Sequence, residues 1–270
     1  MQCQVCGHKN WQNFRRVLDR CERCGFVKAK NKYFKISEKK LYASGYYNGA
    51  DYLNYKAEAR ALLKNFRNRL SRILKYKQKG NLLEIGCAYG FFLSLANEHF
   101  VSSGVEIDEN TARKARKISG CKIYSGDFLK MHFKNNSFDV VCLFDTIEHL
   151  KNPRAYLEKI FRLLKKGGVI VIETGDIDAI LPRVQKSTWR LITPPFHLSY
   201  FSKNTLKRLL DDIGFTKKEL VWVPFYRTLG QTIYRLNRNL LTKDHSLNSV
   251  VFSINVFDLI FGVWEKVDHS

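Results

Sequence analysis

The 270-residue sequence predicts an α/β fold with a mainly parallel sheet, and three observations support this prediction. Short apolar runs alternate with helical patterns from Asn81 until the chain becomes less regular near Leu181, as in consecutive βαβ units. A glycine-rich turn follows the first apolar run and opens a helix. Titratable residues follow the run that ends at Phe144, where α/β enzymes commonly place catalytic groups.

The expected strands alternate with helices, as a sheet covered on both faces requires. The apolar runs that predict them span residues 81–86, 101–107, 121–125, 138–144 and 167–174. Farther along, the sequence predicts a strand at 217–225, an amphipathic basic helix at 227–241 and a last strand at 254–264.

A long amphipathic helix is expected before the first strand, from about Tyr52 to Tyr76. Its basic residues lie opposite an apolar stripe of Leu62, Leu63, Phe66, Leu70, Ile73 and Leu74. We therefore divide the chain into an N-terminal module at 1–30, a helical segment at 31–79 and an α/β domain at 80–270. Two prolines and several aromatic residues near 181–203 interrupt the regular alternation, which predicts an insertion there.

The chain is strongly basic, with 46 Lys and Arg residues against 25 Asp and Glu residues and a formal net charge of +21. Such a charge favours nucleic acid, an anionic membrane surface or phosphorylated substrates. The basic residues are scattered, so a solvated lysine-rich surface explains them equally well. The N-terminus lacks the apolar core of a signal peptide, and no apolar run reaches the ~18 residues of a membrane span. We therefore expect a cytoplasmic protein without a transmembrane segment.

Four of the seven cysteines form two C-x2-C pairs, each followed by glycine. Disulfides are disfavoured in the cytoplasm, whereas two such turns present four thiolates to one tetrahedral Zn²⁺. The sequence therefore predicts a zinc ribbon at 1–30, with redox C-x-x-C motifs as the alternative. Its ligands are Cys3, Cys6, Cys21 and Cys24. The remaining cysteines are expected in the core, and they are Cys87, Cys121 and Cys142.

The turn after the first strand favours S-adenosylmethionine (SAM) over NAD as the cofactor. Glu84, Gly86 and Gly90 form an E-x-G-x-x-x-G pattern, and Glu106 lies at the end of the second strand, where an acidic residue can bind ribose hydroxyls. NAD turns require three small residues in G-x-G-x-x-G, and a carboxylate at Glu84 would repel a pyrophosphate. The same carboxylate suits the cationic amino-acid part of SAM.

These motifs give the chain its resemblance to class I SAM-dependent methyltransferases. From about Tyr46 to Phe215 it resembles the branch of ubiquinone-type O-methyltransferases and sugar methyltransferases, through "LLEIGCAYGFFL", "GVEID", "SGDF", "FDVVCLFDTIEHLKNP", "LLKKGGVIVIET" and "FHLSYFSKNTLKRLLDDIGF". The resemblance implies a Rossmann-like seven-stranded sheet of order 3-2-1-4-5-7-6. It also implies that 31–79 forms a lid over SAM, that 181–203 binds the acceptor, and that a helical insertion lies near 226–245.

The resemblance also implies a set of cofactor-binding residues. Glu106 would hold the ribose, Ile107 would lie against the adenine, and Asp127 would accept a hydrogen bond from the adenine amino group. Asp127 is alternatively a turn cap, and Glu106 a solvated strand end. In chain order the expected residues are Glu84, Gly86, Cys87, Gly90, Glu106, Ile107, Asp127, Phe128 and Asp145.

The pair Glu148 and His149 is expected to be catalytic. The fourth strand lies beside the first, so its carboxyl end faces the methyl group of SAM. His149 can accept the acceptor's proton at neutral pH, and Glu148 can orient the imidazole or stabilise its charge. In relatives, equivalent residues bind a divalent metal, so Mg²⁺ or Mn²⁺ bound by Glu148, His149 and His197 is the alternative. A helix-capping or loop histidine is a further reading of His149.

The acceptor is expected to be contacted by Tyr47, or its neighbour Tyr46, and by Trp189 and His197. Alternatively, Trp189 could be a residue of the hydrophobic core. The function predicted best is methylation of a small molecule: a sugar, a nucleotide-linked or lipid-linked glycan precursor, or a quinone-like ring. A zinc-ribbon RNA methyltransferase is the alternative, because the net charge of +21 suits a phosphate backbone. A lipid-linked substrate would bring the protein to a membrane surface.

Overall fold

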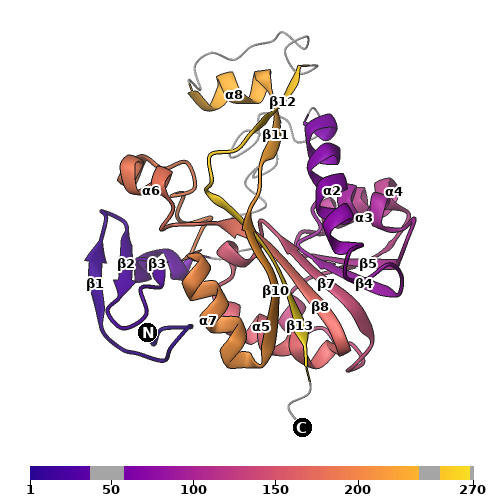
Figure 1. The fold of residues 1–270 in the computed structure, drawn as a ribbon, viewed down its shortest axis with the longest axis horizontal. Helices are drawn as coiled ribbons and strands as arrows, with labels where there is room; N and C mark the ends of the chain where they lie inside the picture. Colours follow the sequence, from indigo (N-terminus) through magenta and orange to yellow (C-terminus); the bar gives the residue numbers. More distant parts are fainter. Residues whose placement is uncertain (37–57, 237–249, 268–270) are drawn as a thin grey trace.

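A central mixed sheet of seven strands organises the computed structural model, which describes residues 1–36, 58–236 and 250–267 (Figure 1). Its strands are β4 (Asn81–Ile85), β5 (Val101–Glu106), β6 (Lys122–Ser125), β7 (Phe138–Phe144), β8 (Leu164–Gly175), β10 (Phe215–Trp222) and β13 (Leu259–Lys266). They lie in the order β6-β5-β4-β7-β8-β13-β10. The first five are parallel, and β13 runs antiparallel to both β8 and β10. The five predicted βαβ strands and the seven-stranded sheet are confirmed.

Helices cover both faces of this sheet, because its central strands are apolar on both sides. Leu82 of β4 joins one buried cluster and its neighbour Leu83 joins the other. The first cluster includes residues of α2 (Ala59–Ile73), α3 (Phe91–Ala96) and α4 (Glu109–Ser119). The second includes residues of α5 (Pro153–Leu163) and α7 (Lys203–Ile213). Cys87, Cys121 and Cys142 are buried, as expected.

Side-chain caps fix where these helices begin, and hence where the loops at the carboxyl edge of the sheet end. The carboxylate of Asp108 accepts from the Thr111 amide at 2.9 Å at the start of α4. Asn152 caps α5 by accepting from the Ala155 amide at 3.1 Å. Ser202 opens α7 with a capping box. The loops between strands and helices are therefore short and ordered.

A second sheet joins two parts of the chain that the sequence separates by about 170 residues. It consists of β1 (Trp11–Phe14), β2 (Leu18–Cys21) and β3 (Val27–Ala29), followed by β9 (Ser199–Tyr200). The predicted insertion near 181–203 thus supplies the fourth strand of the N-terminal module. Figure 1 shows β1 to β3 beside α7, at the flank of the central sheet.

The chain differs from expectation mainly near its C-terminal end. The predicted strand at 217–225 ends at Trp222, and after Pro224 a new strand, β11 (Phe225–Thr228), pairs with β12 (Val251–Ile254) as a separate hairpin. Proline lacks the amide proton that a sheet interior needs, so it separates the two strands. The α8 helix (Leu229–Leu236) follows β11, and the rest of the expected helix, 237–241, lies outside the described residues.

The expected long helix before β4 is described from its middle onward. Its observed part is α2, from Ala59 to Ile73, whereas the expected start near Tyr52 lies outside the described residues. The short helix α6 (Ile180–Gln185) lies in the insertion after β8. None of the helices in the described part of the chain has the length and apolar character of a membrane span. A cytoplasmic location stays a prediction.

Candidate active site

Two glycines with left-handed backbones shape the turn after β4. Gly86 has φ +77°, and a Cβ atom there would lie 2.5 Å from Oγ1 of Thr146. The missing side chain lets this turn pack against the turn after β7. Gly90 also has φ +77°, but a Cβ atom there would meet the carbonyl oxygen of Ala115 in α4 at 3.1 Å. Gly90 thus serves the packing of α3 against α4 and, unlike Gly86, does not line the cavity described below.

Glu84 places a buried carboxyl group at the bottom of this turn. Only 3% of the residue is exposed, and its Oε2 has no hydrogen-bond partner among the described residues. Burial raises the pKa of Glu84 to about 8, although the positive charge of Arg69 opposes the shift. A buried oxygen without a partner is costly, so this position is suited to a cationic or hydrogen-bonding ligand.

Glu106 ends β5 with its carboxyl group turned back toward the glycine turn. Its two oxygens accept hydrogen bonds from the backbone amides of Ala88 at 3.0 Å and Asp108 at 3.2 Å. Burial nevertheless raises the pKa of Glu106 to about 7. Glu106 and the next residue, Ile107, both line the cavity. The alternative of a solvated strand end does not fit a residue that is 3% exposed.

Asp127 begins the short helix after β6. Its Oδ1 accepts a hydrogen bond from the Leu129 amide at 2.9 Å, so Asp127 acts as the turn cap that was the alternative to adenine binding. Its side chain is absent from the cavity lining. The adjacent Phe128 lines the cavity, and its ring packs against that of Tyr156 with centroids 5.3 Å apart.

Together these residues surround a first cavity at the carboxyl ends of β4, β5 and β7. It is open to solvent, and its lining combines charged, polar and apolar side chains, as ligand-binding clefts commonly do. Of the expected cofactor-binding residues, those that line it are Glu84, Gly86, Cys87, Glu106, Ile107, Phe128 and Asp145. Its position matches the rule that open α/β sheets bind ligands outside the carboxyl ends of their strands.

Arg69 connects α2 to the carboxyl ends of β7 and β8. Its guanidinium forms a two-bond ion pair with Glu173 of β8, with Nε 2.9 Å from Oε2, and its Nη2 lies 3.2 Å from Oδ2 of Asp145. The guanidinium also lies over the rings of Phe66 and Phe144, 4.9 Å from each centroid. Asp145 has a left-handed backbone with φ +47°. The ion pair with Arg69 therefore holds the turn after β7 in an uncommon conformation.

His149 lies in this turn with a defined tautomer. Its Nδ1 is 3.0 Å from the carbonyl oxygen of Phe196. Because a carbonyl oxygen can only accept, Nδ1 carries the proton of the neutral ring and Nε2 carries the basic lone pair. The His197 ring lies edge-on to that of His149 at 4.7 Å, and its own Nδ1 is 2.7 Å from the carbonyl of Leu191.

Glu148 is placed differently from its expected role as the partner of His149. Its Oε2 accepts from the Thr174 hydroxyl at 3.0 Å, and burial raises the pKa of Glu148 to about 8. Burial thus favours the neutral form of its carboxyl group. The carbonyl of Phe196 performs the orienting role that the sequence assigned to Glu148. One ligand atom each of Glu148, His149 and His197 lie within 4.8 Å of one another.

A second cavity, also open to solvent, adjoins the first. The two cavities share Leu62, Arg69, Asp145 and His149. Most side chains around the second cavity are polar, and they include Glu58, Asn65, Glu148, Arg190, His197, Arg227 and Gln231. His197, an expected acceptor-binding residue, is therefore in place on its wall.

The β11 strand encloses the second cavity and is attached to α2. The Asn65 amide group donates to the Tyr226 carbonyl at 2.9 Å and accepts from the Tyr226 amide at 2.6 Å. Farther along, Glu58 accepts hydrogen bonds from the hydroxyl and amide of Thr228. One helix therefore bounds the first cavity and carries the strand that encloses the second.

The opposite wall of the second cavity is connected to the N-terminal module. The Leu198 amide donates to the Glu148 carbonyl at 2.8 Å, and the Leu198 carbonyl accepts from the Ala29 amide of β3 at 2.9 Å. The next two residues form β9, which pairs with β3. The segment that orients His149 thus continues into the sheet that carries the four cysteines.

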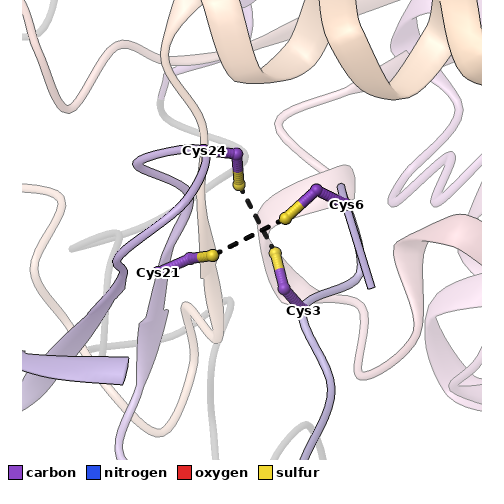
Figure 2. A group of neighbouring side chains, drawn as sticks. All are labelled: Cys3, Cys6, Cys21 and Cys24. Atoms are coloured by element: carbon purple, nitrogen blue, oxygen red, sulfur yellow. Dashed lines mark hydrogen bonds between the residues drawn. The ribbon is translucent and has the colours of Figure 1, made fainter. Parts of the chain in front are cut away.

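The four cysteines come together as predicted. Figure 2 shows their side chains pointing toward one another from two turns. The Sγ atoms of Cys3 and Cys24 are 3.5 Å apart, those of Cys6 and Cys21 are 3.7 Å apart, and all four lie within 4.8 Å of one another. Both turns have the same form: Gly7 and Gly25 are left-handed, and each amide donates to the carbonyl of the first cysteine of its pair.

Of the expected acceptor-binding residues, Trp189 lines neither cavity. The Trp189 ring is buried in a small core with Ile177 and Tyr200, and its Nε1 donates to Asp258 at 2.8 Å. Trp189 thus takes the core position that was its alternative, because an indole N–H with a buried carboxylate partner is satisfied inside the protein. Tyr47, like its neighbour Tyr46, lies outside the described residues.

Sequence reasoning missed the residues that close the site, above all Arg69 and Glu173. Both lie within patterns that were assigned to packing, and their partners are about 100 residues away in the chain. One signal existed: Arg69 interrupts the apolar side of α2 beside Leu70 and Phe66, and Glu173 follows the apolar run of β8. A charged residue on an apolar face indicates a buried partner.

Comparison with known proteins gives a consistent result. A family model described as a methyltransferase domain matches residues 55–220. A probable SAM-dependent methyltransferase of Mycolicibacterium smegmatis is 30% identical over 147 residues, which cover 53% of this chain and 54% of that protein. The matched segment thus spans about half of the mycobacterial relative. A demethylmenaquinone methyltransferase of Staphylococcus saprophyticus is 24% identical, covering 57% of this chain and 77% of the relative.

A solved structure shares the fold. A Pyrococcus horikoshii protein superposes with a TM-score of 0.58 at 19% identity, covering 85% of this chain and all of that one. The family match covers more than half of the 270 residues. The chain therefore belongs to the class I SAM-dependent methyltransferases.

Proposed function

We propose that this enzyme transfers the methyl group of SAM to a small polar acceptor held in the second cavity. The observation that carries the proposal is the wall shared by the two cavities, which includes Arg69, Asp145 and His149. Methyl transfer is an in-line displacement that needs donor and acceptor aligned on one short path. Two cavities that meet at a wall containing a histidine supply this arrangement.

The first cavity fits SAM in its distribution of charge. SAM supplies an electrophilic methyl group when bound. The partnerless Oε2 of Glu84 suits its ammonium group, and Gly86, Cys87 and Asp145 would lie around its methionine end. Glu106 would take the ribose hydroxyls and Ile107 the adenine. Phe128 would complete the lining of the cofactor site. Gly90 and Asp127 would contribute indirectly, because they shape the turns that carry the lining residues.

His149 is the proposed general base. With its Nδ1 proton directed to the Phe196 carbonyl, Nε2 is the nitrogen that can accept a proton from the acceptor. Glu148 supports the turn through Thr174 and its backbone carbonyl, which accepts from Leu198. Burial disfavours a negative charge on Glu148, so the role we propose for it is this support of the turn rather than charge stabilisation of the imidazolium.

A catalytic Mg²⁺ at Glu148, His149 and His197 fits this site poorly. Mg²⁺ prefers oxygen ligands and water, whereas this cluster offers two imidazole nitrogens and one carboxyl group. Mn²⁺ accepts imidazole more readily, but a single carboxyl group supplies little negative charge for it. We therefore assign no step to a metal here.

The lining of the second cavity favours a sugar or glycan precursor over a quinone-like ring. Charged and amide side chains outnumber apolar ones there, and hydroxyl-rich acceptors can satisfy them. The attachment of β11 to α2 encloses the second cavity on one side, which favours a small acceptor over a large one. RNA is the second candidate, favoured by the net charge of +21. If the acceptor were a lipid-linked glycan precursor, its polar head would bind in the second cavity while its lipid stayed in the membrane.

We also propose that the four cysteines bind one structural Zn²⁺. A tetrahedron with Zn–S bonds of about 2.3 Å has edges of about 3.8 Å. The Sγ separations of 3.5 Å and 3.7 Å agree with these edges. Four thiolates leave no open coordination position, so the ion would stabilise the module and, through β3 and β9, the segment that orients His149.

The affinity for SAM is expected to rise with pH between about pH 6 and pH 8. The raised pKa of about 8 keeps Glu84 protonated at lower pH, and the ammonium group of SAM favours the ionised form, so binding must release a proton there. Glu84→Gln should weaken binding by about 1.5–3 kcal/mol and flatten the pH dependence. Isothermal titration calorimetry in buffers of different ionisation enthalpy measures both effects. Equal SAM affinity in the wild type and the variant at pH 8 would refute this role of Glu84.

Replacing His149 by alanine should lower the methylation rate by about 10²–10⁴-fold and leave SAM affinity nearly unchanged. The wild-type rate should fall toward acid pH as the imidazole becomes protonated, and the variant should lose this limb of the profile. Rates against pH, measured with the exposed His132→Ala variant as control, check this prediction.

Two other outcomes would assign His149 differently. Loss of activity with a chelator, restored by Mn²⁺ while the cysteine-bound metal is retained, would indicate a catalytic metal. A small rate loss with the acid limb intact would leave His149 a purely positioning role.

Gently purified protein is expected to contain one zinc per chain, and Cys21→Ser should lose it. Because the module reaches His149 through β3 and β9, that variant should lose methylation rate while retaining SAM affinity. Elemental analysis with calorimetry tests this, with Cys121→Ala, a buried cysteine outside the cluster, as the control. Protein that lacks zinc yet has full activity would contradict both halves of the proposal.

A further inference from the structure

Two aliphatic side chains on α6 project into solvent. Ile180 is 79% exposed and Val184 is 73% exposed. They are four residues apart and therefore lie on the same side of the helix. Figure 1 places α6 apart from the helices that cover the central sheet. Among the described residues, this helix thus presents an apolar surface that no other part of the chain covers.

The α6 helix is fixed in this position by the N-terminal module. The Arg15 guanidinium donates to the carbonyl of Pro182 and to that of Lys186, both at 2.8 Å. Pro182 and Ala179 are buried on the inner side of the helix. The apolar surface is consequently held outward by specific contacts at both ends, rather than exposed by fraying of a helix end.

The apolar surface continues onto the end of β10 and the connection between β12 and β13. Ile180 lines a shallow hollow together with Trp222 of β10. Trp222 is 41% exposed, and its ring packs against that of Phe257, which is 55% exposed, with centroids 6.2 Å apart. The indole Nε1 of Trp222 donates inward to Asp176 at 3.0 Å. We call Ile180, Val184, Trp222 and Phe257 the α6 patch.

The charges around the α6 patch are predominantly positive. Arg183 of α6 and Lys186, directly after α6, are exposed, and the Lys203 ammonium lies 3.3 Å from the Trp222 ring centroid. The nearby acidic groups are engaged: Asp176 is buried against Trp222, and Asp178 forms an ion pair with Arg20 at 2.6 Å. Aliphatic and aromatic side chains within a basic rim match an anionic lipid surface in both polarity and charge.

We propose that the α6 patch docks the protein onto an anionic membrane surface. Ile180 and Val184 would enter the boundary between head groups and acyl chains, where Trp222 also suits the interface. Arg183, Lys186 and Lys203 would contact anionic head groups. The chain that follows α6 continues to Arg190 and Leu191, which line the second cavity. The proposal does not depend on the identity of the acceptor.

Sedimentation with lipid vesicles tests this proposal. Wild-type protein should bind phosphatidylcholine vesicles that contain phosphatidylglycerol, bind pure phosphatidylcholine vesicles much more weakly, and be released by salt. The double variant Ile180→Asp, Val184→Asp should bind the anionic vesicles at least about ten-fold more weakly than the wild type. Its affinity for SAM should stay unchanged.

A matched control is available at Val101. This valine is 74% exposed and is the first residue of β5, so it lies at the amino edge of the parallel strands. The α6 helix follows β8 at the opposite, carboxyl edge. Val101→Asp should bind the vesicles as the wild type does. Wild-type protein that ignores anionic vesicles at low salt, or a double variant that binds them as tightly as Val101→Asp, would overturn the proposal. In the first case, a protein partner would become the better occupant of the patch.

Discussion

The buried guanidinium of Arg69 is the contact on which both cavities depend. It joins α2 to Glu173 at the end of β8 and to Asp145 in the turn after β7, and it lines both cavities. Removing one partner of a buried ion pair typically costs about 3–5 kcal/mol, because the remaining charge stays buried without compensation. Arg69 therefore fixes α2 against the left-handed turn at Asp145. Because β11 is attached to the same helix, the position of β11 depends on this contact as well.

The turn that carries His149 is held on its other side by the segment 196–200. The Phe196 carbonyl sets the tautomer of His149, and Leu198 links the Glu148 backbone to β3. The four-cysteine module thus supports the turn that carries His149, although none of its four cysteines lines either cavity. This explains how a small N-terminal module can matter to an active site without supplying a catalytic group.

Local patterns predicted the elements of the fold and the turn after β4, because strands, glycine turns and C-x2-C pairs are determined over a few residues. They also pointed to Glu84 and Glu106, which lie near the ends of β4 and β5, and to His149, in the turn after β7. They failed where the structure depends on distant contacts. Arg69 meets Glu173 across about 100 residues, β9 joins a sheet formed by the first 30 residues, and Trp189 finds its carboxylate at Asp258. Burial, which a sequence does not display, also raises the pKa of Glu148, and so favours the neutral form of a side chain that was expected to act through its charge.

The proposal that a small polar acceptor meets SAM at the His149 wall is tested most directly by following the methyl group. Labelled SAM, wild-type enzyme and an extract of the source organism would be incubated, and the extract would be separated into RNA, lipid and water-soluble fractions. The account predicts label in a sugar-containing small molecule or lipid head group. It also predicts that this label is largely lost with His149→Ala. Label in RNA, or equal labelling by the variant, would contradict it.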